Sequence, residues 1–227
     1  MTRRGRVALK VLVWSICLSP LAMLLYHAWT ENLGANPISY VTNVLGDTTL
    51  RILLASLAMT PLRLVFGISW QMTLRRLLGL FAFVYAAMHF SVWIVVDHFF
   101  DWAQLLADVR KRPYITVGFT ALVLLIPLAA TSTTRMVKRL GGRNWQRLHG
   151  LVYVIGILAI LHFLWLAKKG RQEPFYYAAV LALLLGVRLW DRAHAVVRKR
   201  RAAAARARPG MAGVAAARVQ IGSRRES

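Results

Sequence analysis

Six long apolar runs, separated by short polar and mostly basic segments, dominate the pattern along the chain. A helix needs about 20 mostly apolar residues to cross roughly 30 Å of hydrocarbon, and each run approaches that length. The pattern therefore predicts an all-α integral membrane protein, built as a bundle of six transmembrane helices. The predicted spans are residues 7–29, 48–66, 77–96, 114–130, 148–167 and 175–190.

The composition supports the membrane class. The chain has 227 residues, of which 58% are hydrophobic, and a mean hydropathy of +0.50. The first run follows a basic start, as a secretory signal does, but its apolar stretch exceeds the usual length of roughly 7 to 15 residues. No clear small-residue cleavage site follows it either. We therefore expect the first run to remain as a membrane helix.

The charge is strongly basic, with a formal net charge of +22 and a sequence pI near 11.6. In a soluble protein this would suggest nucleic-acid binding, because phosphate neutralisation needs clustered Lys and Arg. Here the cations lie between apolar runs, where cytoplasmic flanks of membrane helices carry them and anionic lipid headgroups meet them. The placement argues for membrane lipid as the partner and against nucleic acid.

The distribution of Lys and Arg also predicts orientation. If the N-terminus is inside, 23 of the 30 cations fall on the inner side and seven on the outer side. This bias predicts cytoplasmic termini and a multi-pass protein of the bacterial inner (plasma) membrane. Residues 1–197 are expected to form the membrane domain, and residues 198–227 a basic, disordered cytoplasmic tail. Residues 101–109 are predicted to form a short interfacial helix.

Histidine is the candidate ligand for any buried cofactor. Cys17 is the only cysteine, which excludes an internal disulfide and a four-thiolate iron–sulfur cluster and favours a small apolar role for this residue. Six histidines are present. His89 and His162 lie inside predicted spans, where a buried imidazole without a partner costs on the order of 1–3 kcal/mol. These two residues therefore need partners.

The two intramembrane histidines are predicted to lie at similar depth. At a rise of about 1.5 Å per residue, His89 lies about 20 Å past Arg76 and His162 about 22 Å past Arg147. Both predicted helices run from inside to outside, so the two rings can face each other across a planar ligand in the outer leaflet. This is the geometry that a haem with two axial histidines requires.

The remaining histidines are predicted to have other positions. His149 lies thirteen residues before His162 on the same predicted helix, about 20 Å away along the axis, so the two cannot ligate one iron. His149 belongs to the cytoplasmic edge, where it holds a second haem, contacts a quinone or reaches the interface. His27, His98 and His194 are expected to be interfacial or solvated, although His194 remains a potential partner of His149.

Simpler explanations compete with haem. His89 and His162 can instead form hydrogen bonds between helices, as polar side chains in membranes often do. Gly79, Ala82 and Ala86 make a small-residue stripe that ends at His89, which suits either close helix packing or a macrocycle. A membrane transporter or scaffold without haem is the rival function, and it predicts a colourless protein.

Four runs together resemble the MsrQ (YedZ) family, the haem-binding membrane subunit of a periplasmic methionine-sulfoxide reductase system, within the ferric-reductase-like transmembrane superfamily. The runs are NPISYVTNVLGDTTLRILLASLAMTPLR, RRLLGLFAFVYAAMHF, KRPYITVGFTALVLLIPLAATS and NWQRLHGLVYVIGILAILHFLW. The resemblance covers roughly residues 36–169. It implies that the family's haem histidines correspond to His89, His149 and His162.

The resemblance also implies a function and partners. It implies one or two b haems, electrons drawn from the quinone pool or from cytoplasmic reduced flavin, and transfer to a periplasmic molybdopterin-containing methionine-sulfoxide reductase. The chain would then be an electron-transfer subunit without a catalytic site of its own. FMN is implied as a further cofactor, but the chain has no Gly-rich phosphate loop, so no flavin residue can be assigned.

Overall fold

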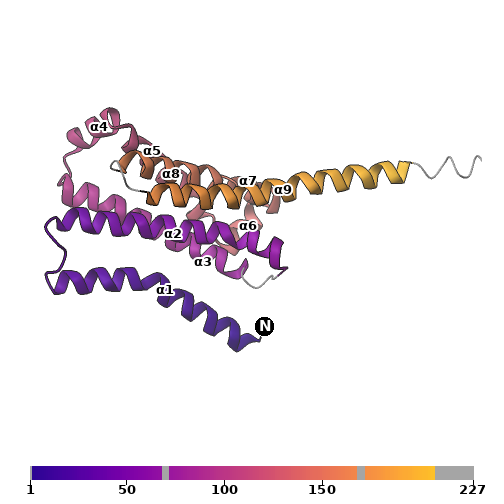
Figure 1. The fold of residues 1–227 in the computed structure, drawn as a ribbon, viewed down its shortest axis with the longest axis horizontal. Helices are drawn as coiled ribbons and strands as arrows, with labels where there is room; N and C mark the ends of the chain where they lie inside the picture. The colour runs from indigo at the N-terminus through magenta and orange to yellow at the C-terminus, as the bar shows by residue number, and fades with distance from the viewer. Residues whose placement is uncertain (1, 68–71, 168–171, 208–227) are drawn as a thin grey trace, which may run out of the picture. The chain divides into compact units, whose positions relative to one another are not determined.

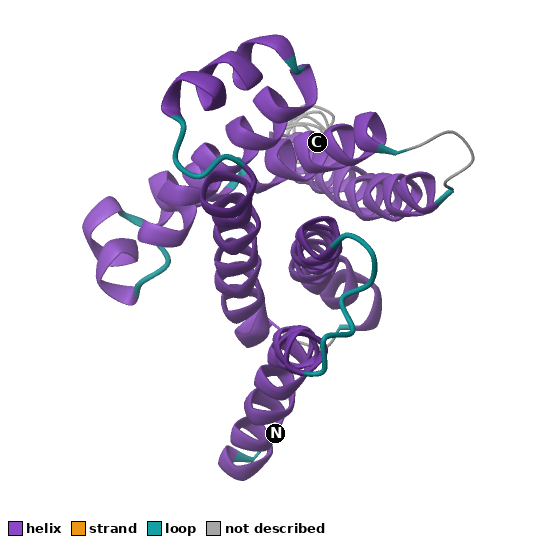
Figure 2. Ribbon diagram, turned by 90° about the vertical axis from the view of Figure 1, so that its left-hand side faces the viewer, coloured by secondary structure: helices purple, strands orange, loops and turns teal. Residues whose placement is uncertain are grey.

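The computed structural model describes residues 2–67, 72–167 and 172–207, and helices joined by short loops make up nearly all of them (Figure 2). The described residues form no strand, which confirms the all-α class. The chain divides into two compact units, Met1–Leu185 and Gly186–Ser227, and the candidate site lies in the first. The helices (Figure 1) are α1 Arg3–Trp29, α2 Pro37–Phe66, α3 Met72–Val92, the π-helical turn η1 Trp93–Asp97, α4 Trp102–Lys111, α5 Pro113–Ala130, α6 Thr134–Leu140, α7 Gly142–His149, α8 Val152–Leu166 and α9 Glu173–Ala207.

Five stretches of the described chain are long and apolar enough to cross a membrane. They confirm a multi-pass membrane protein, and they match the first five predicted spans. The stretches are Arg3–Trp29, Pro37–Phe66, Leu74–Asp97, Pro113–Ala130 and Gly142–Leu166.

The sixth predicted span, residues 175–190, is helical within α9. Its crossing of the membrane stays a prediction. The predicted tail begins inside α9, which continues to Ala207, and residues 208–227 lie outside the described residues.

Helix α2 begins earlier than the hydrophobic pattern indicates. Asn36 caps it by accepting a hydrogen bond from the Ser39 amide, and Pro37 occupies the first turn, where its missing N–H costs nothing. The predicted span begins only at residue 48, because residues 37–47 are too polar to count as apolar. These additional polar turns of α2 carry part of the candidate site.

Four helices surround the centre of the first unit. Helix α2 packs along α3 and α5 packs along α8, while contacts of α3 with α5 and of α2 with α8 join the two pairs (Figure 1). Small and apolar side chains fill the contact between them, including fully buried Ala82 and the nearly buried Leu53, Tyr85 and Ile155. These two helix pairs bring the predicted third and fifth spans together.

Helix α1 lies outside this group of four. The buried Tyr85 hydroxyl of α3 donates to the Cys17 carbonyl at 2.6 Å. Pro20 lies inside α1 and cannot donate to the Ile16 carbonyl, which accepts the Ser19 hydroxyl at 2.9 Å instead. Cys17 itself is 3% exposed, which confirms its predicted role as a small buried residue.

The predicted fifth helix is two helices in the structure. Helix α7 ends at His149, the turn at Gly150 and Leu151 follows, and α8 begins at Val152. The Gly150 amide bonds back to both the Gln146 and Arg147 carbonyls, which closes the last turn of α7. The predicted fifth span is thus one apolar stretch, Gly142–Leu166, whose helix is interrupted by this turn between His149 and His162.

After η1 the chain makes a sharp turn and continues as α4, which covers His98. Phe99 and Phe100 have left-handed backbone φ values of 46° and 63°, and this turn leads into α4. His98 is only 9% exposed, and its Nε2 lies 3.3 Å from the Asp108 carboxylate of α4. His98 is therefore not solvated, because α4 covers it and places Asp108 beside it, while its position at the membrane interface stays a prediction.

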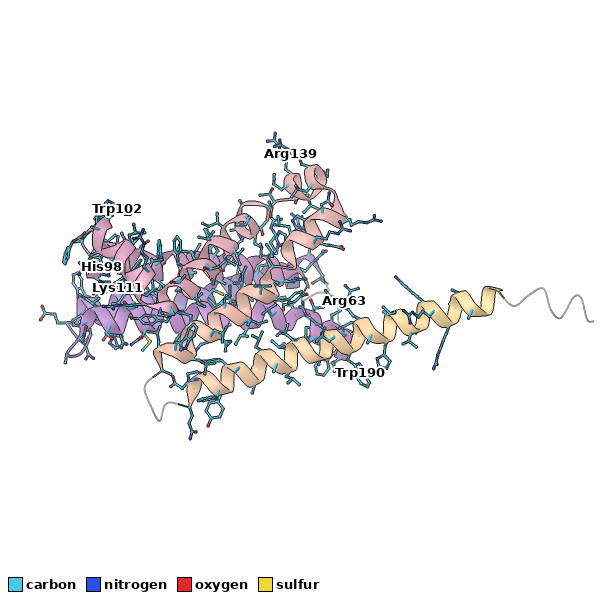
Figure 3. All side chains as sticks on the ribbon, turned by 90° about the horizontal axis from the view of Figure 1, so that it is seen from above. Arg63, His98, Trp102, Lys111, Arg139 and Trp190 are labelled. Atoms are coloured by element: carbon cyan, nitrogen blue, oxygen red, sulfur yellow. The ribbon has the colours of Figure 1, made fainter. Side chains whose placement is uncertain are left out.

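Cations lie at both ends of the first unit. Lys111 lies at one end, near His98 and Trp102, and Arg63 and Arg139 lie toward the other (Figure 3). This separation agrees with the predicted division into outer and inner loops, although the sidedness itself stays a prediction.

A paired-histidine cavity as the candidate functional site

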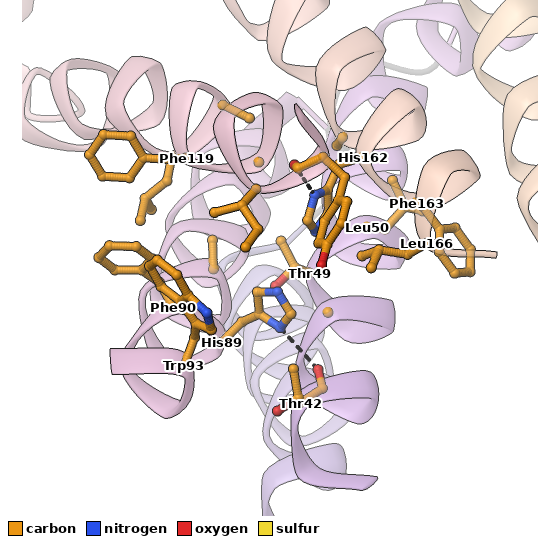
Figure 4. A pocket seen from close by; sticks show the side chains of 18 of the residues that line it. Thr42, Thr49, Leu50, His89, Phe90, Trp93, Phe119, His162, Phe163 and Leu166 are labelled. Carbon is orange, nitrogen blue, oxygen red and sulfur yellow. Dashed lines mark hydrogen bonds between the residues drawn. The ribbon is translucent and has the colours of Figure 1, made fainter. Parts of the chain in front are cut away.

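A cavity of about 600 Å³ lies between α2, α3, α5 and α8. Its size is within the range of ligand pockets, roughly 300–1,000 Å³. His89 enters it from α3 and His162 from α8, with their rings directed toward each other (Figure 4). The ring centres are 6.2 Å apart and the ring planes cross at 84°. The predicted proximity of the two intramembrane histidines is confirmed.

His89 is fixed by the polar first turns of α2. Its Nδ1 lies 2.9 Å from the Thr42 carbonyl oxygen. A carbonyl oxygen only accepts hydrogen bonds, so Nδ1 carries the proton and Nε2 keeps its lone pair. One turn further along α2, a Cβ atom on Gly46 would lie 3.2 Å from the imidazole. Because Gly46 has no side chain, the His89 ring can pack directly against α2.

His162 is fixed in the same way by α5. Its Nδ1 lies 2.7 Å from the Tyr114 carbonyl oxygen, which again leaves the lone pair on Nε2. Four residues later, a Cβ atom on Gly118 would lie 2.7 Å from Nδ1 of this ring. Each histidine thus donates a hydrogen bond to a carbonyl of the neighbouring helix and packs against a glycine one turn further along that helix.

The two rings meet the geometric requirements of axial metal ligands. A hydrogen bond from one ring nitrogen to a carbonyl is the usual way in which proteins orient a ligating histidine and fix its tautomer. With a metal–nitrogen bond of about 2 Å, two imidazoles on opposite sides of one metal have their centres about 6 Å apart. The observed separation is 6.2 Å, so the residues present fit a haem held by two histidines.

The remaining cavity wall is apolar along its length and polar at one end. Aliphatic and aromatic side chains line the cavity, including Leu50, Phe90 and Phe119 (Figure 4). Ala82 and Ala86 also line the cavity, whereas a Cβ on Gly79 would approach Ser56 of α2. The small-residue stripe therefore serves both the cavity and helix packing.

Polar groups line the cavity near the beginnings of α2 and α5 and at the end of η1. The polar and charged side chains among the lining residues are Ser39, Thr42, Asn43, Asp47, Thr49, Asp97, Arg112 and Tyr114, in addition to the two histidines. The arrangement suits an amphipathic ligand whose charged groups lie at one edge.

Arg51 does not line the cavity. Its Nε donates to the Tyr177 hydroxyl at 2.8 Å, and the charge of Asp47, four residues earlier, also acts on it.

His149 lies outside the cavity lining. Its Nε2 is 3.0 Å from the Thr131 hydroxyl, and that hydroxyl donates its single proton to the Pro127 carbonyl at 2.6 Å. Thr131 must therefore accept from His149, so here Nε2 carries the proton. Trp145 stacks on the His149 ring at 3.9 Å and donates to the Thr131 carbonyl at 3.0 Å.

Sequence reasoning identified both cavity histidines but not their supports. Gly46, Gly118 and the carbonyls of Thr42 and Tyr114 lie in segments whose sequence does not indicate contact with a histidine. For Gly118, a glycine in an otherwise apolar helix was the available signal, since it often marks a close approach.

Comparison with known proteins identifies the family of this chain. The model of the ferric reductase like transmembrane component matches residues 45–160, which includes most of the cavity. A relative from Ralstonia nicotianae, named "Protein-methionine-sulfoxide reductase heme-binding subunit MsrQ", is 50% identical and aligns with 81% of this chain and 85% of its own length. Proteins of the same name from Herminiimonas arsenicoxydans and Rhodospirillum rubrum are 50% and 48% identical, over 80% and 82% of this chain and 84% and 88% of theirs. The chain therefore belongs to the MsrQ family of the ferric-reductase-like membrane proteins.

Proposed function

We propose that this chain is a membrane electron-transfer subunit that binds b haem through His89 and His162. The observation that carries the proposal is the pair of imidazoles 6.2 Å apart, each with Nδ1 bonded to a backbone carbonyl. Haem, when bound, supplies one-electron chemistry. The chain's own residues hold the ligand, exclude lipid from it and set its position between the two membrane faces.

The direction of transfer follows from the predicted topology. With both termini in the cytoplasm and six spans, the cavity lies toward the periplasmic side and His149 toward the cytoplasmic side. We propose that electrons from the quinone pool or from cytoplasmic reduced flavin enter near His149 and leave from the cavity. The acceptor is a separate periplasmic molybdopterin-containing methionine-sulfoxide reductase, which repairs oxidised proteins. FMN remains a proposal from family resemblance without residues assigned to it.

The stacked Trp145 and His149 rings support a role at the electron input. The two ring centres are 3.9 Å apart, so the stacked rings form one aromatic surface along α7. To ligate a second haem through Nε2, His149 would have to exchange its bond with Thr131 for a metal bond. Ligation through Nδ1 needs no such exchange. A second haem at this histidine is therefore compatible with the proposal only through Nδ1 or after this rearrangement.

A reduced-minus-oxidised visible spectrum of the detergent-purified protein tests the proposal. We expect a b-type spectrum in the unmodified chain and in His27→Ala, a half-buried histidine of α1 that does not line the cavity and serves as the matched control. His89→Ala and His162→Ala should each lose this spectrum, while His149→Ala should retain the signal of the cavity haem. A colourless protein after expression with ample haem would instead favour the transporter or scaffold.

A further inference from the structure

Arg112 is placed to serve the cavity. It directly precedes Pro113, the first residue of α5, and lies two residues before Tyr114, whose carbonyl holds His162. Both Arg112 and Tyr114 line the cavity. Among the described residues that line it, Arg112 is the only Lys or Arg. A permanent positive charge therefore lies within one helical turn of the His162 support.

Neighbouring side chains orient the Arg112 guanidinium without enclosing it. Its Nε lies 3.3 Å from Asp108 Oδ1, and its Nη1 donates to the Tyr114 hydroxyl at 3.3 Å. The side chain is still 53% exposed, whereas that of Asp108 is 12% exposed. A guanidinium has five N–H donors in a planar fork. Beyond those two contacts, the fork retains donors that can bind a carboxylate.

The acidic residues at this end have positive or imidazole neighbours of their own. Asp108 is shared between Arg112 and His98, each at 3.3 Å, and Asp97 lies 4.0 Å from His98. Asp47 lies within the field of Arg51. The carboxylates at this end therefore each lie near an arginine or an imidazole, and Arg112 supplies the fixed positive charge of the described cavity lining.

A b haem needs such a site because it is amphipathic. Its two propionate carboxylates cannot be buried in hydrocarbon without partners, while its macrocycle requires apolar walls. The cavity offers both environments, with Leu53, Leu125 and Ile155 along its wall and Ser39, Asn43 and Arg112 in its polar lining. Arginine matches the planar geometry of a carboxylate better than lysine does.

We propose that Arg112 binds a haem propionate and thereby sets the orientation of the macrocycle in the cavity. This inference rests on the proposed function, because it concerns the ligand that His89 and His162 would hold. Asp108 and Tyr114 act as positioning residues, since they hold the guanidinium beside the cavity through the contacts above. The site is thus a carboxylate-binding site formed where α4 leads into α5.

The test compares haemin with haemin dimethyl ester, in which both carboxylates are neutral. Full-length apoprotein in detergent is titrated with each compound, and binding is followed by the visible absorbance of the bound haem. The variants are Arg112→Ala, Arg112→Lys and the matched control Lys111→Ala. Lys111 is a neighbouring exposed cation that does not line the cavity, so its removal changes the same charge without changing the site.

We expect Arg112→Ala to weaken haemin binding about tenfold to a hundredfold, the usual effect of losing a hydrogen bond to a charged group. Binding of the dimethyl ester to Arg112→Ala should change by less than about twofold. The haemin affinity of Arg112→Lys should lie between those of Arg112→Ala and the unmodified chain. Lys111→Ala should bind both compounds as the unmodified chain does. The unmodified chain should bind haemin more tightly than the ester.

Two results would overturn the inference while leaving the haem proposal intact. One is unchanged haemin binding in Arg112→Ala. The other is an equal loss for haemin and its ester, which would show that Arg112 only maintains the structure. Failure of the proposed function gives a different result, because the unmodified chain would then bind neither compound at a defined stoichiometry.

Discussion

The histidines of the cavity and the histidine at the end of α7 are held in opposite ways. His89 and His162 each donate from Nδ1 to a backbone carbonyl and keep the Nε2 lone pair. His149 donates from Nε2 to the Thr131 hydroxyl. A backbone carbonyl cannot rotate away as a side chain can. The cavity rings are therefore preorganised for a metal, whereas the His149 ring is fixed by a side chain and an aromatic stack.

The comparison extends to the surrounding backbone. Both cavity rings pack against a glycine on the neighbouring helix, where a Cβ would lie 3.2 Å from His89 or 2.7 Å from His162. The His149 ring instead packs on a large side chain, Trp145. Close approach of a ring to a helix backbone therefore distinguishes the proposed metal ligands, His89 and His162, from His149.

The largest effect is expected from Gly118→Ala. Its Cβ would lie 2.7 Å from Nδ1 of His162, so the ring or the α5 backbone must move and the bond to the Tyr114 carbonyl must lengthen. We expect haem affinity to fall by at least about tenfold, as measured by haem titration, since metal-site supports typically contribute 10–100-fold. Gly79→Ala is the control, because its Cβ would meet Ser56 Oγ at an ordinary 3.7 Å.

A smaller effect is expected from Gly46→Ala. The added Cβ would lie 3.2 Å from the edge of the His89 ring, a tight contact that a shift of a few tenths of an ångström relieves. We expect haem affinity to fall severalfold, less than in Gly118→Ala, in the same titration. A larger loss of haem affinity in Gly46→Ala than in Gly118→Ala would contradict this account, because ligand binding would then not depend on how closely each ring packs against its glycine.

The smallest effect on the cavity is expected from Thr131→Val. Valine keeps the shape of threonine but removes the hydroxyl that accepts from His149. We expect an unchanged content of cavity haem and slower reduction by a donor on the cytoplasmic side, by about two- to tenfold, corresponding to one hydrogen bond. Stopped-flow reduction provides the rate, and Thr131→Ser retains the hydroxyl as the control. A loss of cavity haem would contradict the separation of the two regions.

The sequence predicted the parts of the site that depend on burial and spacing. An imidazole in a membrane span needs a partner, and equal depth on two parallel spans predicted that His89 and His162 meet. The supports depend instead on which helix faces meet, which one chain's periodicity does not specify. Gly46 and Thr42 lie in a polar segment outside the predicted spans, and this segment is helical in the structure, where Asn36 caps α2.

Two details that the hydrophobic pattern did not predict also have local causes. The break after His149 follows from the turn at Gly150, which an apolar run of this length conceals. His98 is covered because the turn at Phe99 and Phe100 returns the chain as α4 and places Asp108 beside it. Neither a tight turn nor a long-range pairing is encoded in hydrophobic periodicity.

Electron paramagnetic resonance of the oxidised, haem-loaded protein tests the central claim most directly. Two axial imidazoles make ferric haem low-spin, and loss of one ligand makes it largely high-spin. We therefore expect a low-spin signal in the unmodified chain, and its replacement by a high-spin signal in whatever haem His89→Ala or His162→Ala retains. Persistence of the low-spin signal in both single variants would contradict ligation of one haem by this pair.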